Sequence, residues 1–408
     1  MRTRFKETLR CLAMSGALLA LCVANAQPAS SEASHASPQH APCAPPPNLA
    51  DGWAIETDPE VSGFDVAQLC VVLSKFAASE VNFHSLIIER RGKLVAEVYK
   101  RGKDESIYSL FASTTTFDAR MRHDVRSISK SVVSLLWGIA DAEGRMPPLH
   151  TPVLDLLPEL DEFNNEGREK ITVAHLLTMR SGLDWSEPNT YTAQNDEFGL
   201  YWRSSQAHYV FNRPMAAPAG ALYNYNGGGT AILAQILTKR VGMSLPEYAR
   251  KVLFTPLGIT DWTWVNDVRG RPLAFAGLRL RPRDMAKIGR MVLGDGKQFG
   301  NWQGKQIVPA EWIKQSIRRH VQMPDPPGWQ YGYQWWLGEV DALNMKHDWA
   351  AGFGNGGQRL FMVPSLDLVV VTTAGEYGKP AIGREGYQLF RQIASALRTN
   401  SSLVAPRN

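Results

Sequence analysis

The sequence predicts an α+β fold, in which both ends of the chain build one antiparallel sheet flanked by helices and an inserted segment is mostly helical. Three observations lead to this class. Two apolar runs at 86–100 flank Arg91-Gly92, periodicity is helical from about 121 to 295, and short β-branched or aromatic runs follow about 330. We therefore expect a sheet domain over 49–120 and 296–408, and a helical domain over 121–295.

The individual elements follow from local signals. Helices fit 66–79, the segment that Ser127 opens, and 386–397, and strands fit 329–338, 359–364 and 366–375. A further helix fits 171–183, with Thr172 as its cap and Gly182 as its stop. Helices also fit 230–242 and 281–296, ended by Gly242 and Gly294.

The first 26 residues predict a secretory signal peptide. Four basic residues precede an apolar stretch, CLAMSGALLALCV, which ends at the small-residue pattern ANA of 24–26. The alternatives are a membrane anchor, which would need about 18 apolar residues, and a lipoprotein site at Cys22, where bulky Leu21 replaces the expected small residue. We expect an exported protein, periplasmic or secreted, without a stable membrane anchor after cleavage.

Charge and cysteine content follow from this cleavage. Of the net charge of +5, residues 1–26 carry +3, and no basic block remains that would indicate nucleic-acid binding. Residues 27–48 are rich in Ser, Ala, Pro and His and predict a flexible lead. Export leaves Cys43 and Cys70, which could pair in an oxidising compartment and join this lead to the first helix. Two free or buried thiols are the alternative.

Most familiar catalytic motifs are missing from the sequence. It contains no G-x-S-x-G and no H-E-x-x-H. The glycine-rich stretch 352–357 matches G-x-G-x-x-G, but a strand-like run follows it where a dinucleotide site would need a helix. We therefore predict neither a metal nor a cofactor, and the sequence carries no signal for an oligomeric state.

Ser127 and Lys130 are the remaining candidates for chemistry. On a helix these positions share one face. A serine hydroxyl needs a base to become a nucleophile, and a lysine serves as that base if its pKa falls from about 10.4. The alternative is an ordinary helix cap followed by a surface lysine, because S-x-x-K arises by chance about once or twice in a chain of this length.

Six segments, which follow one another along the chain, support the catalytic interpretation. They are RSISKSVVSLLWGIA, ITVAHLLTMRSGLDW, LYNYNGGGTAILAQIL, LRLRPRDMAKIGRMVLGDG, QIVPAEWIKQS and GNGGQRLFMVPSLDLVVVTTAG. Together they resemble the serine hydrolases of the β-lactamase and penicillin-binding-protein superfamily, above all its class C-like branch of esterases and 6-aminohexanoate-dimer hydrolases. The resemblance covers roughly 50 to 400 and implies a β-lactamase-like fold.

The resemblance also implies roles for single residues. Ser127 becomes the nucleophile, Lys130 its base and Tyr225 the proton relay. Tyr223 is the alternative relay, but relatives carry a leucine pair seven and eight residues after this tyrosine, which Ile232 and Leu233 match from Tyr225. The backbone N–H groups of Ser127 and Asn355 would form the oxyanion hole, which needs no particular side chain.

Two departures from the family narrow the expected substrate. Tyr225-Asn226-Gly227 lacks the usual asparagine two residues after the tyrosine. The Lys/His-Thr-Gly motif is replaced by GFG at 352–354, or by AAG at 350–352 in the other register, so no cation is available there to hold a substrate carboxylate. We expect hydrolysis of a small-molecule ester or amide, preferably neutral. The alternatives are a β-lactamase, a D-Ala-D-Ala peptidase, or a non-catalytic binding protein.

Overall fold

The computed structural model describes residues 41–188, 192, 194–294 and 298–398. The predicted signal peptide and residues 27–40 of the predicted lead lie outside the described residues. Within the described part of the chain, no helix is both long enough and apolar enough to cross a membrane.

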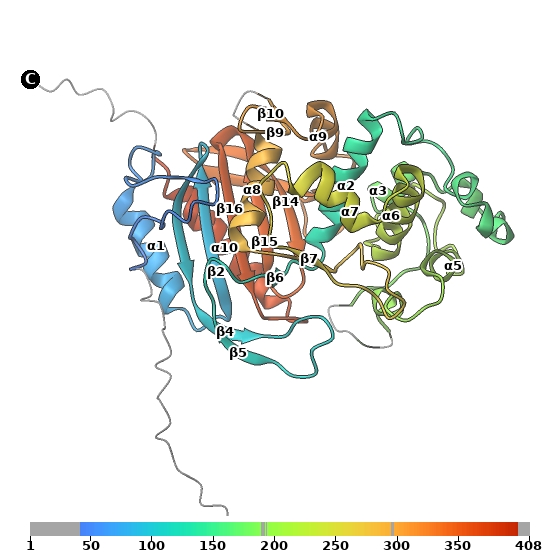
Figure 1. Ribbon diagram of the computed structural model, residues 1–408, viewed down its shortest axis with the longest axis horizontal. Helices are drawn as coiled ribbons and strands as arrows, with labels where there is room; N and C mark the ends of the chain where they lie inside the picture. The colour runs from blue at the N-terminus through green and yellow to red at the C-terminus, as the bar shows by residue number, and fades with distance from the viewer. Residues whose placement is uncertain (1–40, 189–191, 193, 295–297, 399–408) are drawn as a thin grey trace, which may run out of the picture. The chain divides into compact units, whose positions relative to one another are not determined.

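A nine-stranded sheet forms the centre of the fold (Figure 1). Its strands, in spatial order, are β1 (Ala54–Ile55), β3 (Lys93–Tyr99), β2 (Phe83–Arg90), β16 (Leu368–Ala374), β15 (Gln358–Val363), β14 (Met345–Gly354), β13 (Trp336–Ala342), β12 (Gln330–Tyr331) and β11 (Val321–Gln322). All neighbours are antiparallel except the edge pair β1–β3. The sheet therefore joins both ends of the chain, which confirms the predicted fold class.

The helices are α1 (Val66–Ala78), α2 (Ile128–Ala142), α3 (Val173–Leu177), α4 (Asp196–Gly199), α5 (Gln206–Phe211), α6 (Gly227–Val241), α7 (Leu245–Ala249), α8 (Pro282–Leu293), α9 (Ala310–Ser316) and α10 (Ala381–Ser395). Small sheets pair β4 (Arg101–Asp104) with β5 (Ser113–Thr116), β9 (Asn301–Trp302) with β10 (Lys305–Gln306), and β8 (Leu278–Leu280) with both β6 (His123–Asp124) and β7 (Thr263–Trp264).

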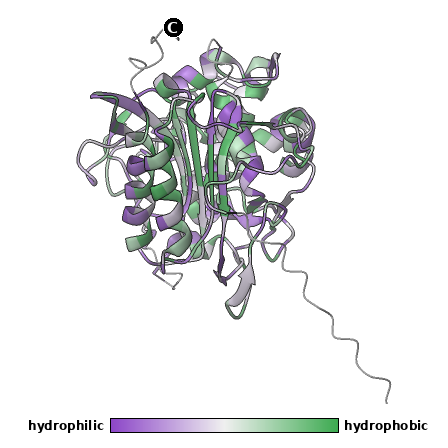
Figure 2. Cartoon of the chain, turned by 90° about the vertical axis from the view of Figure 1, so that its left-hand side faces the viewer, coloured by the Kyte–Doolittle hydropathy of each residue, from purple (hydrophilic) through white to green (hydrophobic). Residues whose placement is uncertain are grey.

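Helices cover both faces of the sheet, so its central strands β2, β16 and β15 are buried on both sides. Along β2, Ile87 joins the core that contains α2 and α8, whereas Leu86 and Ile88 join the core beneath α1 and α10. This alternation is the period of two that a strand imposes. Figure 2 shows the hydrophobic strands between helices of mixed hydropathy. Helix α8, which lies inside the predicted helical domain, packs against β2, β15 and β16, and the predicted domain boundaries stay a prediction.

Several predicted element ends are confirmed. The β2–β3 hairpin turns at Arg91 and Gly92, whose φ values of 53° and 84° suit a two-residue turn of the primed type. Gly242 ends α6 and Gly294 ends α8. The helix predicted over 171–183 is wrong in length, because α3 stops at Leu177.

Helix α3 ends at Leu177 because the backbone groups that follow it bond to distant parts of the chain instead of continuing the helix. Thr172 caps the helix as predicted, but Met179 adopts a φ of 57°. The Met179 carbonyl then accepts a hydrogen bond from the N–H of Asn224, and the Gly182 carbonyl accepts one from Ala216. These hydrogen bonds join residues 179–182 to residues 216–224, the part of the chain just before Tyr225.

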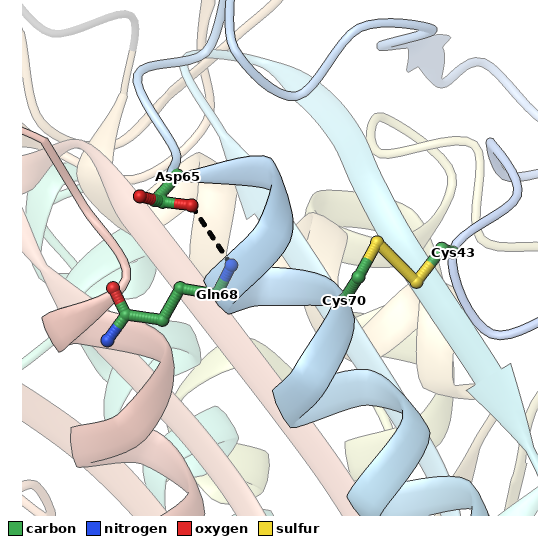
Figure 3. Close-up of a disulfide and its surroundings, with 4 residues drawn as sticks. All are labelled: Cys43, Asp65, Gln68 and Cys70. Carbon is green, nitrogen blue, oxygen red and sulfur yellow. Dashed lines mark hydrogen bonds between the residues drawn. A yellow bond between two sulfur atoms is a disulfide. The ribbon is translucent and has the colours of Figure 1, made fainter.

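Cys43 and Cys70 form a disulfide that ties the chain before the sheet to α1 (Figure 3). Asp65 caps the same helix by accepting a hydrogen bond from the N–H of Gln68 at 3.0 Å. Residues 41–48, the described end of the predicted lead, also contact the fold through Pro47, whose carbonyl accepts a hydrogen bond from Arg283. Of the two alternatives for these cysteines, the structure contains the pair.

Candidate active site

Ser127 lies immediately before α2, at a sharp turn of the chain. Arg126 precedes it with a φ of 50°, in the left-handed region that side chains rarely adopt. The Ser127 side chain makes no capping hydrogen bond. Its Oγ instead accepts a hydrogen bond from Lys130 Nζ at 3.0 Å. The capping alternative therefore does not describe this serine.

Lys130 is buried, with 1% of its surface exposed. Its ammonium meets three acceptors: Ser127 Oγ, Glu197 Oε2 at 2.8 Å and the Phe275 carbonyl at 3.1 Å. An ammonium has three N–H donors, so all are used. Burial lowers the pKa of Lys130, but the Glu197 carboxylate and the Tyr225 hydroxyl outweigh it and raise the pKa above its usual value. The lowered pKa that would make Lys130 a free base is absent from this resting arrangement.

Tyr225 joins Ser127 and Lys130, whereas Tyr223 does not. The Lys130 ammonium lies 5.0 Å from the centre of the Tyr225 ring, and the Tyr225 hydroxyl hydrogen-bonds the Ser127 side chain. Burial raises the pKa of Tyr225 to about 12, although the Lys130 charge opposes this. The Tyr223 hydroxyl is buried without a hydrogen-bond partner among the described residues, and its ring packs on Tyr331.

Two carboxylates complete this cluster, and the sequence analysis missed both. Glu197 is the second residue of α4 and is 5% exposed. Glu187 Oε1 accepts hydrogen bonds from Trp185 Nε1 at 2.6 Å and from the N–H of Gly227. Burial, and the nearby charge of Glu197, raise the pKa of Glu187 to about 8. Glu187 therefore holds a proton near neutral pH.

Gly227 explains why the carboxylates fit. A Cβ atom at this position would lie 2.6 Å from Glu197 Oε2 and 3.0 Å from Glu187 Oε1. The asparagine of relatives would occupy that space. The departure seen at Gly227 was thus the one sequence signal for the carboxylates, although it did not say which residues replace the missing amide.

Gln334 locks together the helices that carry the site. Its carbonyl accepts a hydrogen bond from Ser131 Oγ on α2 at 2.7 Å, and its Oε1 accepts one from Thr230 Oγ1 on α6 at 2.8 Å. Its Nε2 donates to the Leu176 carbonyl on α3 at 3.0 Å. A buried residue bonded to three helices keeps Ser127, Lys130 and Tyr225 in register.

The end of β14 runs past Ser127 in the first of the two predicted registers. Phe353, Gly354 and Asn355 line the same cavity as Ser127. A Cβ atom on Gly354 would lie 2.2 Å from the Val125 carbonyl oxygen, so only glycine allows this approach. In the other register, Ala350 and Ala351 are buried in the sheet. The Asn355 side chain accepts a hydrogen bond from the N–H of Gly378 at 3.0 Å.

The cavity in front of Ser127 has a volume of about 670 Å³. Its aromatic wall comprises Tyr225, Trp329, Trp336, Phe353 and Tyr387. Its charged lining comprises Glu187, Glu197, Asp325, Arg359, Lys379 and Arg384. A volume of this size suits a small organic substrate. No group of three or more His, Cys, Asp or Glu side chains placed to hold a metal ion occurs in the part of the chain that the structure describes.

The sequence and the fold are both similar to known hydrolases. The model of the beta-lactamase family matches residues 85–390. The chain is 26% identical, over 305 residues, to the 6-aminohexanoate-dimer hydrolase of Paenarthrobacter ureafaciens, covering 70% of this chain and 71% of that protein.

Two solved structures share the fold at lower identity. A family VIII carboxylesterase superposes with a TM-score of 0.60 at 16% identity, over 79% of this chain and 95% of that one. The octameric penicillin-binding protein homologue from Pyrococcus abyssi superposes with a TM-score of 0.57 at 22% identity, over 82% of this chain and 79% of that one.

The fold and the family match together define a serine hydrolase of the β-lactamase and penicillin-binding-protein superfamily. The chain belongs to the beta-lactamase family, and the relatives named above include a 6-aminohexanoate-dimer hydrolase and a carboxylesterase.

Proposed function

We propose that this protein is an exported serine hydrolase that cleaves an ester or amide bond through an acyl-enzyme on Ser127. One observation carries the proposal: Ser127 Oγ is free of any capping bond and lies 3.0 Å from Lys130 Nζ, at the wall of a cavity of about 670 Å³. A nucleophile beside a proton-accepting group is the arrangement that acyl transfer needs. The survival of serine, lysine and tyrosine speaks against a non-catalytic binding protein.

The Lys130–Glu197 pair supports a proton path for the first step. As Ser127 Oγ bonds to the substrate carbonyl carbon, its proton passes to Lys130 Nζ, which hands a proton across 2.8 Å to Glu197. The bond to the leaving group then breaks, and the leaving oxygen or nitrogen takes a proton from Tyr225. Lys130 replaces that proton, because its charge lies beside the phenol ring.

Water completes the reaction. It attacks the acyl carbon as Tyr225 takes one of its protons and passes its own phenol proton to the neutral Lys130 amine. The bond to Ser127 Oγ breaks as this oxygen recovers a proton from Lys130, and Glu197 then returns its proton to Lys130, which restores the resting ion pair. In both steps the negative carbonyl oxygen would accept hydrogen bonds from the backbone N–H groups of Ser127 and Asn355. Removing one such donor typically costs on the order of 10²-fold in kcat.

The choice of ester or amide rests on the relatives. Among the relatives, the 6-aminohexanoate-dimer hydrolase is the example for an amide bond and the carboxylesterase is the example for an ester bond. The absence of Lys/His-Thr-Gly from β14 argues against a penicillin-recognising enzyme. We therefore rank ester or amide hydrolysis above β-lactam or D-Ala-D-Ala cleavage.

Export is supported by the sequence of 1–26 and by the Cys43–Cys70 disulfide, because disulfides persist in oxidising compartments. The protein would then act in the periplasm or outside the cell. N-terminal sequencing of the protein recovered from outside the cytoplasm should start at Gln27. A chain that stays in the cytoplasm with residues 1–26 attached would contradict export.

A substrate panel tests the reaction class. Wild type and Ser127→Ala are assayed with p-nitrophenyl butyrate, a p-nitroanilide and nitrocefin, and are labelled with a fluorophosphonate. We expect ester or amide turnover and labelling of wild type only, with Ser113→Ala, an exposed serine on β5, as a control that keeps both. Labelling of Ser127→Ala would contradict an acyl-enzyme on Ser127. Rapid nitrocefin turnover would favour the alternative of a penicillin-recognising enzyme.

A further inference from the structure

We propose that Arg359 forms a carboxylate-binding subsite in this cavity, so that the hydrolase prefers esters or amides that carry a second, anionic group. This inference rests on the proposed function and names its substrate class. It revises the expectation of a neutral substrate, which followed from the missing cation on β14. The neighbouring strand β15 supplies a cation instead.

Arg359 is held in place by the end of β14. It pairs with Phe353 across the two strands, and its guanidinium carbon lies 4.6 Å from the centre of the Phe353 ring. Its Nη1 donates to the carbonyls of Gly354 at 3.0 Å and Gln358 at 2.8 Å. These two bonds use both hydrogens of Nη1 and leave Nε and Nη2 without an acceptor among the described residues.

The charge of Arg359 has no counter-charge in the described part of the chain. No carboxylate oxygen there lies within 4.0 Å of its guanidinium, unlike Arg283, which meets Glu97 at 2.7 Å, and Arg290, which meets Glu89 at 3.0 Å. Burial alone lowers the pKa of Arg359 to about 10, so it stays charged at neutral pH. An unpaired charge in a cavity wall is costly unless a ligand completes it.

The surroundings of Arg359 suit an anion. Arg384 and the first turn of α10 line the same wall, and the amino end of a helix favours negative charge. Gly383 leaves room, because a Cβ atom there would lie 3.1 Å from Arg359 Nη2. An arginine with Nε and Nη2 open binds a carboxylate through two parallel hydrogen bonds.

The carboxylates of the cavity do not cancel this preference. Glu197 is engaged by the Lys130 ammonium, and Glu187 carries a proton near neutral pH. Asp325 is exposed. Arg359 and Ser127 line the same cavity, so a carboxylate bound at Arg359 would belong to a substrate whose scissile carbonyl reaches Ser127.

Matched ester pairs test the subsite. The p-nitrophenyl monoesters of succinate, glutarate and adipate are compared with their methyl-capped neutral twins, and 4-butyryloxybenzoate with its methyl ester, which moves the carboxylate to the leaving group. We expect wild type to favour at least one anionic member. Arg359→Met should lower kcat/KM for that member by about 10- to 100-fold, the usual worth of a hydrogen bond to a charged group, and change its neutral twin by less than about threefold.

Two further variants and one binding measurement keep the result decisive. Arg359→Lys should recover part of the preference, and Arg391→Met, at an exposed position of α10 that does not line the cavity, should change it by less than about threefold, because exposed charges are screened. Calorimetry of the uncleaved monoester on Ser127→Ala, with and without Arg359→Met, reads the subsite without catalysis. An anionic-to-neutral ratio unchanged in Arg359→Met, or an equal loss in Arg391→Met, would overturn the subsite. Failure of wild type to cleave any ester or amide in the two panels would overturn the proposed function separately.

Discussion

Lys130 and Glu197 form a buried ion pair in which Nζ lies 2.8 Å from Oε2, beside Gly227, the position where the family's usual asparagine is missing. The pair makes Lys130 a cation in the resting protein, since Glu197 raises its pKa. A cation cannot accept the Ser127 proton unless it first gives one away. The proposed role of Lys130 as a base therefore depends on Glu197 as its proton acceptor.

Replacing Glu197 tests that dependence. Glu197→Gln keeps the shape and an acceptor oxygen but removes the charge. We expect kcat near pH 7 to fall by about 10²-fold, the usual worth of a positioned proton acceptor, and to recover as the pH rises, because the pKa of Lys130 is lower without Glu197 and the neutral amine forms more readily. A pH profile of kcat measures both effects. Glu159→Gln, on an exposed pair with Lys239, is the matched control. An unchanged kcat at pH 7 would remove Glu197 from the proton path.

Gly227 should be intolerant of the family's asparagine as long as the carboxylates are present. Gly227→Asn would place a Cβ atom 2.6 Å from Glu197 Oε2, and overpacking of this kind costs about 1–3 kcal/mol of stability. Adding Glu197→Ala to the same chain should restore part of that loss, since the space is then vacated. Denaturant unfolding of the two single variants and the double variant measures the coupling. Strictly additive losses would mean that the two positions do not compete for one space.

Tyr225 and Tyr223 offer a comparison within two residues. Tyr225→Phe removes the hydroxyl that bonds to Ser127 and should lower kcat by about 10²-fold or more. Tyr223→Phe removes a buried hydroxyl that has no partner among the described residues, so it should leave kcat and stability nearly unchanged. Equal losses of kcat in both variants would contradict the assignment of the relay to Tyr225.

The sequence predicted those parts of the site that sit in local patterns. Ser127 and Lys130 share one helical turn, and Tyr225 lies beside a glycine-rich helix start. Short stretches of sequence were therefore enough to predict these three residues. Glu197 was not predicted, because it lies 67 residues from Lys130 in sequence and contacts it only in the folded chain. Arg359 was not predicted, because its position opposite Phe353 depends on the register between β14 and β15.

The fold shows the same division between local and distant causes. Caps and glycine stops predicted the ends of α6 and α8, whose backbones bond within the helix. The helix predicted over 171–183 was too long because the Met179 and Gly182 carbonyls find partners about 35 to 45 residues away, at Asn224 and Ala216. Periodicity could not show that competition.

Glu187 should make stability depend on pH near neutrality. The pKa of Glu187 is about 8 in the folded protein, against its usual 4.5, so the folded protein holds a proton that the unfolded chain releases. Its stabilising contribution is complete below about pH 4.5 and is lost as the pH rises through about 8. Glu187→Gln keeps an acceptor for the Gly227 N–H without titrating, and its Tm should fall less between pH 6 and 9 than that of wild type. Parallel Tm curves for the two proteins would contradict the raised pKa.

The Cys43–Cys70 disulfide should stabilise the fold through the chain that it closes. The bond spans 27 residues, and a loop of this length loses about 3.5 kcal/mol of unfolded-state entropy when it is closed. We expect Cys43→Ser to lower the free energy of unfolding by about 2–4 kcal/mol. Activity should stay nearly unchanged at temperatures where the variant is folded, because the bond joins α1 to the chain before the sheet and neither cysteine lines the cavity in front of Ser127. Denaturant unfolding of wild type with and without a reductant measures the same quantity without a mutation. A reductant that left the unfolding midpoint of wild type in place would show that this bond does not constrain the unfolded chain.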